Sequence, residues 1–240
     1  MNKPYIIIHT HTSIDGNIDV MDLQEFEEAS RQYQELSLDS EKQQFDIQGY
    51  LNGKISTEDN ITFYKKPELD EHAPLVPEGD YVADAKAPMY YLSIDPRGEL
   101  AFEKNTYGYG GAPAHIVEIL TEQASNAYKD FLRKKKISYI IAGKDTIDYD
   151  VMLDKFYNLF QIKRMMVGGG GTINWSFLQN GLVDEVSVIL APTANADPEG
   201  NRFFVAKEPY SSIQATAFQL ESVKELEHGT LWIRYSVKKK

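Results

Sequence analysis

A run of four glycines, Gly168 to Gly171, is the feature of this sequence with the clearest chemical use. An apolar segment precedes it, and a short amphipathic segment follows it directly. Glycine lets a backbone turn approach a bound group closely, and the N-terminus of the next helix adds partial positive charge. This order of strand, glycine turn and helix predicts a site for a phosphorylated ligand, with a nucleotide cofactor as the leading candidate.

The two standard phosphate-binding patterns are absent from the chain. The dinucleotide pattern G-x-G-x-x-G would need a further glycine where Ile173 and Asn174 stand, and G-x-x-x-x-G-K-[ST] occurs nowhere. The alternative is a glycine turn needed only for tight packing of a strand against a helix. Four consecutive glycines exceed what packing requires, so ligand binding is favoured.

Three polar residues near the N-terminus are candidates for catalysis. His9 and His11 lie two apart in a strand-like segment, so their side chains are predicted on one face. Such a pair can bind zinc, but no third ligand with a recognisable spacing accompanies it, so we predict no metal site. Asp15 follows the same segment, and we expect it to share a crevice with the glycines, because open α/β sheets bind ligands at strand ends. The alternatives are two hydrogen-bonded core histidines and an aspartate that only ends its strand.

Composition excludes several classes of protein. There is no cysteine, which excludes disulfides, thiolate catalysis and Cys-ligated metals, and no G-x-S-x-G pattern of a serine hydrolase. A net charge of −11 over 240 residues argues against nucleic acid or an anionic membrane as a partner. We find no signal-peptide pattern and no apolar stretch of membrane-spanning length. A soluble, cytoplasmic protein that acts on a small molecule is therefore expected.

Hydrophobic patterning predicts alternating strands and helices. Apolar runs predict strands over residues 5–12, 45–50, 88–94, 115–120, 138–142, 164–167 and 186–191. Amphipathic spacing predicts helices over 20–36 and 124–136, and one that reaches Phe160 with Asp148 or Asp150 as its cap. Residues 108–113 are expected to form a loop, and residues 218–226 and 230–237 a terminal hairpin.

This alternation predicts an α/β fold, with a mostly parallel central sheet flanked by helices and an antiparallel C-terminal hairpin. No internal repeat or domain linker is evident, so we predict a single domain over residues 1–240. Residues 54–86 are polar and contain three prolines, which predicts an irregular surface excursion.

Four stretches of the chain match a known family. The first is Pro4-Tyr5-Ile6 leading to Thr12-Ser13-Ile14-Asp15-Gly16, and the second is Tyr90 to Asp95. The third is Tyr139 to Gly143 followed by Asp148. The fourth runs from Gly169 to Thr172 and continues through Gly181-Leu182-Val183-Asp184-Glu185 to Ala191-Pro192. On these residues the chain resembles the dihydrofolate-reductase-like superfamily, and specifically the pyrimidine reductase domain of riboflavin biosynthesis. The matches span nearly the whole chain, and residues 54–86 match poorly.

The resemblance implies an NADPH-binding enzyme, often a homodimer. In the family, the glycine turn and the following helix start hold the cofactor pyrophosphate. The cofactor contacts implied for this chain are Thr12, Gly49, Asn52, Ser93, Arg97, Gly169, Gly170, Gly171, Thr172 and Ile173. Arg97 is the candidate for the 2′-phosphate, since a guanidinium can hold it with two hydrogen bonds.

The reaction that the resemblance implies is that of a 5-amino-6-(5-phosphoribosylamino)uracil reductase. Hydride passes from the nicotinamide to the ring-opened ribose imine of the substrate, while the protein holds the two face to face. Asp15 is the first candidate for polarising the reacting group or handling its proton. His9 and His11 are the second, because an imidazole that titrates near neutrality can donate a proton. A basic contact for the substrate phosphate is expected among Lys54, Arg97 and Lys104.

The residues expected to contact the substrate differ from the usual family pattern. Gly168 stands where these reductases usually have a glutamate that helps to hold the pyrimidine, His9 stands where they usually have lysine, and their W-I-T segment is missing. The alternatives are therefore a reductase of another pteridine or small carbonyl compound, and a nucleotide-binding protein without catalysis.

Overall fold

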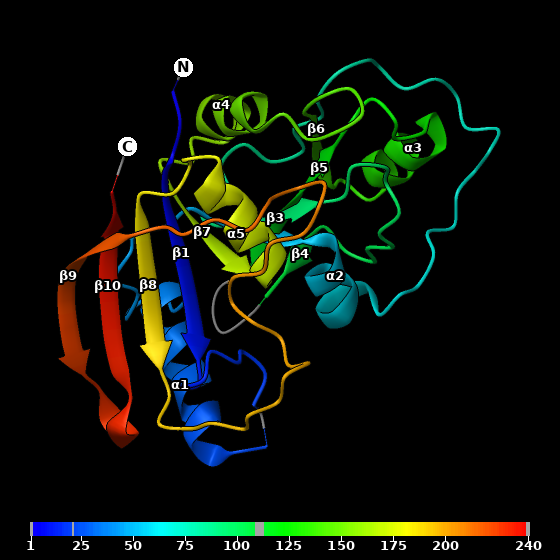
Figure 1. Cartoon of the computed structure of the whole chain (residues 1–240). Helices are drawn as coiled ribbons and strands as arrows, with labels where there is room; N and C mark the ends of the chain where they lie inside the picture. Colours follow the sequence, from blue (N-terminus) through cyan, green and yellow to red (C-terminus); the bar gives the residue numbers. More distant parts are fainter. Residues whose placement is uncertain (1, 21, 109–112, 239–240) are drawn as a thin grey trace. The chain divides into compact units, whose positions relative to one another are not determined.

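The computed structural model describes residues 2–20, 22–108 and 113–238 (Figure 1). It confirms the predicted fold class, because the strand pairings are mostly parallel and the C-terminal strands are antiparallel. The chain divides into two compact units. The flanking unit comprises Tyr5–Asp46 and Met166–Lys240, and the middle unit comprises Ile47–Met165 with Met1–Pro4. Most of the loop predicted at 108–113 lies outside the described residues, and the single domain stays a prediction.

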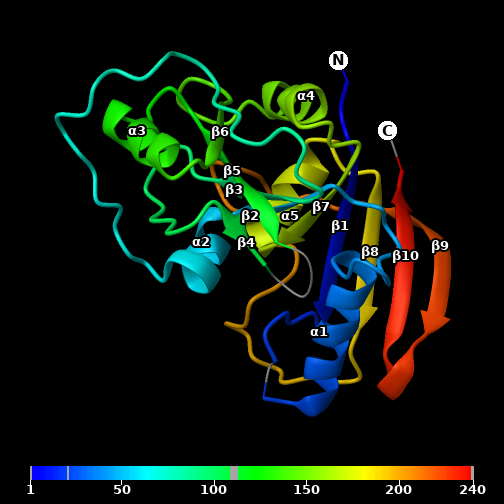
Figure 2. The same cartoon turned by 180° about the vertical axis from the view of Figure 1, so that it is seen from behind.

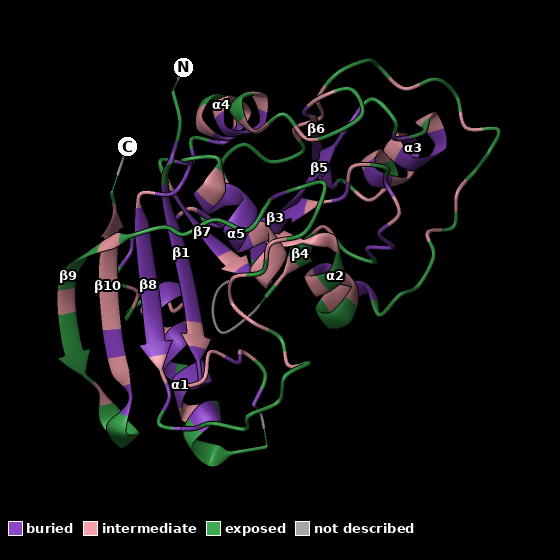
Figure 3. Cartoon of the chain, viewed as in Figure 1, coloured by how far each residue is buried: buried purple, intermediate pink, exposed green. Residues whose placement is uncertain are grey.

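The flanking unit is built on a sheet. β1 (Tyr5–Thr12) pairs in parallel with β8 (Glu185–Leu190), which pairs antiparallel with β10 (Leu231–Val237), and β10 pairs antiparallel with β9 (Phe218–Glu225). β1 and β8 are almost entirely buried, whereas β9 is largely exposed (Figure 3). Helix α1 (Gln24–Ser37) covers one face of β1 and β8 (Figures 1 and 2). The predicted hairpin is confirmed, with the short helix η2 (Glu227–Gly229) at its turn.

The middle unit contains the parallel strands β2 (Gly49–Gly53), β3 (Tyr90–Ile94) and β5 (Ala114–Leu120). β4 (Thr106–Tyr107) pairs antiparallel with the start of β5, and β6 (Ser138–Ile141) pairs in parallel with its end. The helices of this unit are α2 (Lys54–Thr57), η1 (Glu58–Thr62), α3 (Asn126–Lys134) and α4 (Tyr149–Leu159). Asp148 rather than Asp150 caps α4, because its carboxylate accepts the N–H of Val151 at 3.1 Å.

Two predicted boundaries are wrong. The strand expected from Phe45 begins only at Gly49, since Asp46 has a left-handed backbone (φ +48°) that interrupts the extended chain. Helix α1 begins at Gln24 rather than Val20, because Leu23 is still extended at φ −110° and ψ 129°. The remaining predicted strands and helices are confirmed to within about two residues, the margin within which assigned element ends differ.

The predicted excursion begins with the helical residues 54–62 and has neither helix nor strand over 63–89. Its later part is nevertheless held in place. Tyr81 and Tyr139 exchange two backbone hydrogen bonds of 2.9 Å, and the guanidinium of Arg133 lies 4.5 Å from the Tyr81 ring centre. The excursion therefore covers the side of β6 that β5 leaves open, which shields unpaired strand groups from other chains. Over the described residues, no helix is both long and apolar enough to cross a membrane.

Candidate functional site

The glycine run forms a bend between β7 (Arg164–Gly169) and α5 (Gly171–Gln179). Gly169 has φ +117°, a conformation that side chains rarely allow, and the Gly169–Gly170 peptide is cis. The carbonyl of Gly170 accepts the N–H groups of Ile173 and Asn174 at 3.1 and 3.2 Å, which starts the helix. The bend is therefore a backbone structure that depends on glycine.

Three N–H groups at this bend are open. Those of Gly170, Gly171 and Thr172 donate no hydrogen bond to any residue that the structure describes, and no side chain caps α5. The first N–H groups of a helix lack partners within the helix and give its N-terminus partial positive charge. This arrangement can bind an anionic group such as a phosphate.

A loop over residues 193–205 packs against the bend. The N–H of Val205 donates to the carbonyl of Gly171 at 3.1 Å, and the amide nitrogen of Asn174 donates to Phe203 O at 3.0 Å. A Cβ on Gly171 would overlap the carbonyl oxygen of Arg202, so only glycine fits there. The same residue, Gly171, thus serves close packing on one side while its N–H stays open.

The 193–205 loop also holds the turn after β1. Asp15 Oδ2 accepts the N–H groups of Ala196 at 2.7 Å and Asn195 at 3.3 Å. The guanidinium of Arg202 donates to Asp15 O and, at 2.9 Å, to Asp197 O. Asp15 and the glycine bend are thus attached to one loop. The turn residues 195–200 predict a loop after the strand, but their types alone gave it no role at the site.

The Asp15 carboxylate is an acceptor. The Ser13 hydroxyl donates to it at 2.5 Å and, with the Ala196 N–H, lowers its pKa below the ordinary value. Asp15 is therefore ionised at neutral pH and has no proton to give. Thr12 is buried beside it, and its hydroxyl lies 3.2 Å from Asn17 O.

His9 and His11 do contact one residue in common, Tyr33 of α1, which confirms that they share a face of β1. His9 Nε2 lies 3.2 Å from Tyr33 O, and Nδ1 lies 2.9 Å from Ser187 Oγ. Since the carbonyl can only accept, Nε2 holds the proton and Nδ1 accepts from Ser187. Burial lowers the pKa of His9 to about 3 and that of His11 to about 4. The expectation that these imidazoles titrate near neutrality is wrong, because desolvation disfavours the protonated form of both rings, of which His9 is fully buried and His11 partly buried.

The predicted cofactor contacts of the middle unit differ in accessibility. Gly49 is buried, and a Cβ there would lie 3.1 Å from Leu92 Cδ1. Ser93 is fully buried, and its hydroxyl is 3.0 Å from that of Thr57. Both are closed to a cofactor in this structure. Asn52 is half-buried beside Ser93 in the β2–β3 register, and Arg97 is exposed and donates to Gln123 Oε1 at 3.3 Å.

The three candidates for a substrate phosphate contact also differ. Lys54 already forms ion pairs with Glu99 and, at 3.8 Å, with Glu58. Lys104 and Arg97 are exposed. Arg202, which was not among the predicted contacts, forms no ion pair with a carboxylate of the described residues. Within those residues, no three His, Asp or Glu side chains gather as a metal site.

The fold of this chain is shared by solved structures of a pyrimidine reductase-like protein and a riboflavin biosynthesis reductase. A pyrimidine reductase-like protein from Corynebacterium diphtheriae matches 100% of this chain and 94% of its own, with a TM-score of 0.64 at 16% identity. A riboflavin biosynthesis reductase from Saccharomyces cerevisiae matches 98% of this chain and 90% of its own, with a TM-score of 0.59 at 12% identity. These likenesses show that the chain has the same fold as these two proteins.

Sequence comparison gives the family. Residues 104–232 match the RibD C-terminal domain family, and the chain belongs to that family. The 2,5-diamino-6-ribosylamino-4(3H)-pyrimidinone 5′-phosphate reductase of Aquifex aeolicus is 25% identical over 192 residues, which are 80% of this chain and 78% of that protein. A protein of the same name from Methanothermobacter thermautotrophicus is 39% identical over 59 residues, which are 25% of this chain and 27% of that protein.

Proposed function

We propose that the chain is an NADPH-dependent pyrimidine reductase of riboflavin biosynthesis. Family membership and the names of the relatives support the pyrimidine substrate. The observation that most supports a nucleotide cofactor is the set of open N–H groups at Gly170, Gly171 and Thr172, which suits a diphosphate. When bound, the nicotinamide supplies the hydride that reduces the ribosyl imine to a ribitylamino group.

The substrate has two possible forms that differ in one exocyclic group. The name of both curated relatives contains a diaminopyrimidinone, whereas the sequence resemblance points to the corresponding aminouracil. An amino group in the first form replaces a carbonyl oxygen in the second. We propose that the chain accepts one of these two phosphoribosylamino-pyrimidines, and a direct comparison of turnover identifies which.

The roles of the residues follow from their surroundings. Thr172 and the glycines before it would hold the diphosphate with backbone N–H groups. Asp15 would fix the 193–205 loop and, as an ionised group, stabilise developing positive charge rather than donate a proton. Arg202 has a guanidinium without an acidic partner and is the candidate contact for an anionic substrate group. The burial of His9 does not favour it as a proton donor.

Cofactor binding and turnover test this proposal separately. NADPH should raise the melting temperature of the protein, because a ligand that binds only the folded state stabilises it. Addition of either phosphoribosylamino-pyrimidine should then cause oxidation of NADPH. Absence of NADPH protection would overturn the whole proposal, and protection without turnover of either pyrimidine would overturn its substrate half.

A reductase with a different small carbonyl substrate is the second candidate. It is favoured by Gly168, which replaces the glutamate that usually holds the pyrimidine in the family. NADPH protection together with oxidation by a pteridine or a small carbonyl compound, and not by either pyrimidine, would support it.

We also propose a cytoplasmic homodimer. β9 pairs only with β10 among the described strands, and its Leu220 and Val223 side chains are about half exposed. An exposed edge strand with apolar side chains favours association with a second copy. Sedimentation of the purified protein measures the oligomeric state, and a monomer at all concentrations would contradict the proposal.

A further inference from the structure

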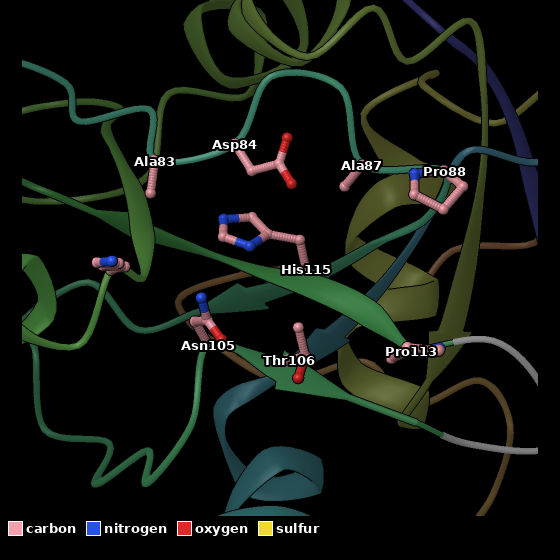
Figure 4. A pocket seen from close by; sticks show the side chains of 9 residues that line it. Ala83, Asp84, Ala87, Pro88, Asn105, Thr106, Pro113 and His115 are labelled. Carbon is pink, nitrogen blue, oxygen red and sulfur yellow. The ribbon is translucent and has the colours of Figure 1, made fainter.

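A hollow of about 270 Å³ opens in the middle unit, between the end of the excursion and the start of β5 (Figure 4). Asp84 belongs to the excursion and His115 to β5. Thr106 is the first residue of β4, and Asn105 directly precedes it. Residue 84 lies outside the part of the chain that matches the family, residues 104–232. One wall of this hollow is therefore made by a segment that the family match does not include.

The hollow lies at the N-terminal ends of the parallel strands. His115 is the second residue of β5 and pairs with Tyr90, the first residue of β3. The predicted nucleotide contacts of this unit, Asn52 and Ser93, pair with each other nearer the carboxyl ends of β2 and β3. Open α/β sheets bind nucleotides at carboxyl ends, so the hollow is separate from the cofactor position that the resemblance implies within this unit.

The floor of the hollow is a buried imidazole with one free ring nitrogen. His115 is 3% exposed, and its Nε2 lies 2.8 Å from Ser138 Oγ. Ser138 Oγ also accepts the N–H of Ala83 at 2.9 Å, which leaves its own proton available to Nε2. Nδ1 of His115 has no hydrogen-bond partner among the described residues. In the tautomer that Ser138 favours, Nδ1 presents an N–H.

A hydrogen-bond acceptor lies on one side of this imidazole, and side chains that can donate lie on the other. The Asp84 carboxylate points toward the His115 ring from one side, and Asn105 and Thr106 lie on the other side (Figure 4). Asp84 Oδ1 accepts the backbone N–H of Lys86 at 2.8 Å, which fixes the carboxylate. Within the described residues, the side chains of Asn105 and Thr106 make no hydrogen bond. The remaining walls include the apolar residues Ala87 and Pro88 and the cationic residue Lys136.

This arrangement selects a ligand by size and by hydrogen bonding. Pockets for drug-sized ligands are about 300–1,000 Å³, so the hollow fits a single ring and excludes a dinucleotide. A carboxylate accepts two N–H groups from an amino group and an adjacent ring nitrogen. An imidazole N–H and a side-chain amide can both donate to a ring carbonyl. Apolar walls suit the faces of a planar ring.

We propose that this hollow binds a single-ring heterocycle of the aminopyrimidinone type. Asp84 accepts the hydrogen bonds of the amino edge, and His115 with Asn105 donates to the carbonyl edge. The residues that line this site all belong to the middle unit and include none of the glycine bend. This inference does not rest on the proposed function.

Titration of the full chain with isocytosine, followed by calorimetry, tests the proposal. Isocytosine has an amino group, a ring N–H and a carbonyl, whereas uracil lacks the amino group. We expect uracil to bind at least about tenfold more weakly, which corresponds to one lost charge-assisted hydrogen bond. Asp84→Asn should weaken isocytosine binding by a similar factor, and Asn105→Ala by a smaller one. Lys86→Ala is the matched control, because its backbone N–H still holds Asp84.

Each other outcome overturns the assignment. Absence of isocytosine binding at millimolar concentration, or equal binding of uracil, shows that the amino edge is not recognised. Unchanged binding by Asp84→Asn shows that isocytosine binds elsewhere. If the chain bound the free amino acid glycine through Asp84 but did not bind isocytosine, the ligand of the hollow would be a zwitterion instead. Asp84→Asn should leave NADPH protection intact, so failure here is distinguishable from failure of the proposed function.

Discussion

The carbonyl oxygen of Arg202 occupies the space that a Cβ on Gly171 would need. Through this contact the 193–205 loop is seated on the first residue of α5, and the same loop holds Asp15 through the N–H of Ala196. A change at Gly171 is therefore expected to affect both the bend and the turn after β1.

Gly171→Ala should lower the free energy of unfolding by about 1–3 kcal/mol, the usual cost of overpacking against groups that cannot move easily. The contacted atom is a backbone carbonyl, so the loop itself has to shift. Urea unfolding measures the loss. Gly170→Ala is the control, since a Cβ there meets nothing within 4 Å. Equal losses in the two variants would show that the Arg202 contact is not the cause.

Thr172→Asp should weaken NADPH binding by at least about tenfold without lowering stability. A negative charge in the first turn of a helix stabilises the helix, but it repels a diphosphate bound to the same N–H groups. Thr172→Asn is the neutral variant of the same shape and should bind nearly as well as the parent chain. Thermal shift with NADPH measures affinity and stability together. Normal NADPH binding by Thr172→Asp would contradict the diphosphate site.

Acid should destabilise the protein through His9 and His11. Their pKa values of about 3 and about 4 in the folded chain lie below the ordinary value of 6.5, so the unfolded chain binds more protons between these limits. Stability is therefore full above pH 6.5 and falls as the pH decreases, by about 2 kcal/mol for each histidine at pH 5. Urea midpoints across this range measure the effect.

The variants of this experiment separate buried from exposed imidazoles. His11→Phe keeps an aromatic ring against Phe26 and should remove about half of the acid sensitivity. His228→Asn should change little, because the His228 side chain is 51% exposed and asparagine tolerates its left-handed backbone. An unchanged pH profile in His11→Phe would show that other groups cause the acid effect.

Glu118→Gln should stabilise the protein at alkaline pH. Burial raises the pKa of Glu118, and the nearby Asp95 carboxylate raises it further. Tyr128 Oη lies 2.8 Å from Glu118 Oε1 and 2.9 Å from Leu100 O. Because Tyr128 has one proton and Leu100 O can only accept, a protonated Glu118 completes the set of donors.

The sign of the Glu118 effect follows from the raised pKa. The contribution of this carboxyl group to the free energy of unfolding is complete below 4.5, its pKa in the unfolded chain. It is lost as the pH rises through the higher pKa of the folded chain. Glutamine keeps a donor and cannot ionise, so its advantage should grow as the pH rises from the ordinary carboxyl range to alkaline values. A constant difference between the variant and the parent chain over this range would contradict a buried neutral carboxyl.

Arg133→Met should loosen the excursion without unfolding the rest of the middle unit. The guanidinium lies 4.5 Å from the Tyr81 ring centre and 5.5 Å from that of Tyr139, and it donates to Tyr139 Oη at 2.9 Å. Loss of the cation–π contacts and this bond should cost about 1–2 kcal/mol locally. Limited proteolysis should then cut residues 63–83 faster, whereas Lys129→Met on the same helix should leave the rate unchanged. Equal rates would show that Arg133 does not hold the excursion.

The sequence by itself determined the order of most strands and helices, a cap for α4 at Asp148 or Asp150, and the glycine bend. These features depend on hydrophobic periodicity, capping side chains and the backbone freedom of glycine, which act over a few neighbouring residues. Four stretches, within residues 4–16, 90–95, 139–148 and 169–192, also suggested the family. The start of β2 was misplaced because a left-handed residue, Asp46, leaves no trace in hydrophobic patterning.

Only the tertiary structure decided which polar groups are available for chemistry. The Asp15 carboxylate accepts from Ala196, 181 positions away, and burial beside Tyr33 keeps His9 neutral. Ser93 is closed by Thr57, whereas His115 keeps a free nitrogen in a hollow that the distant residue Asp84 completes. Hydrogen bonding and desolvation depend on groups that meet only after folding, and for this reason residue type and spacing could nominate these side chains but not assign their state.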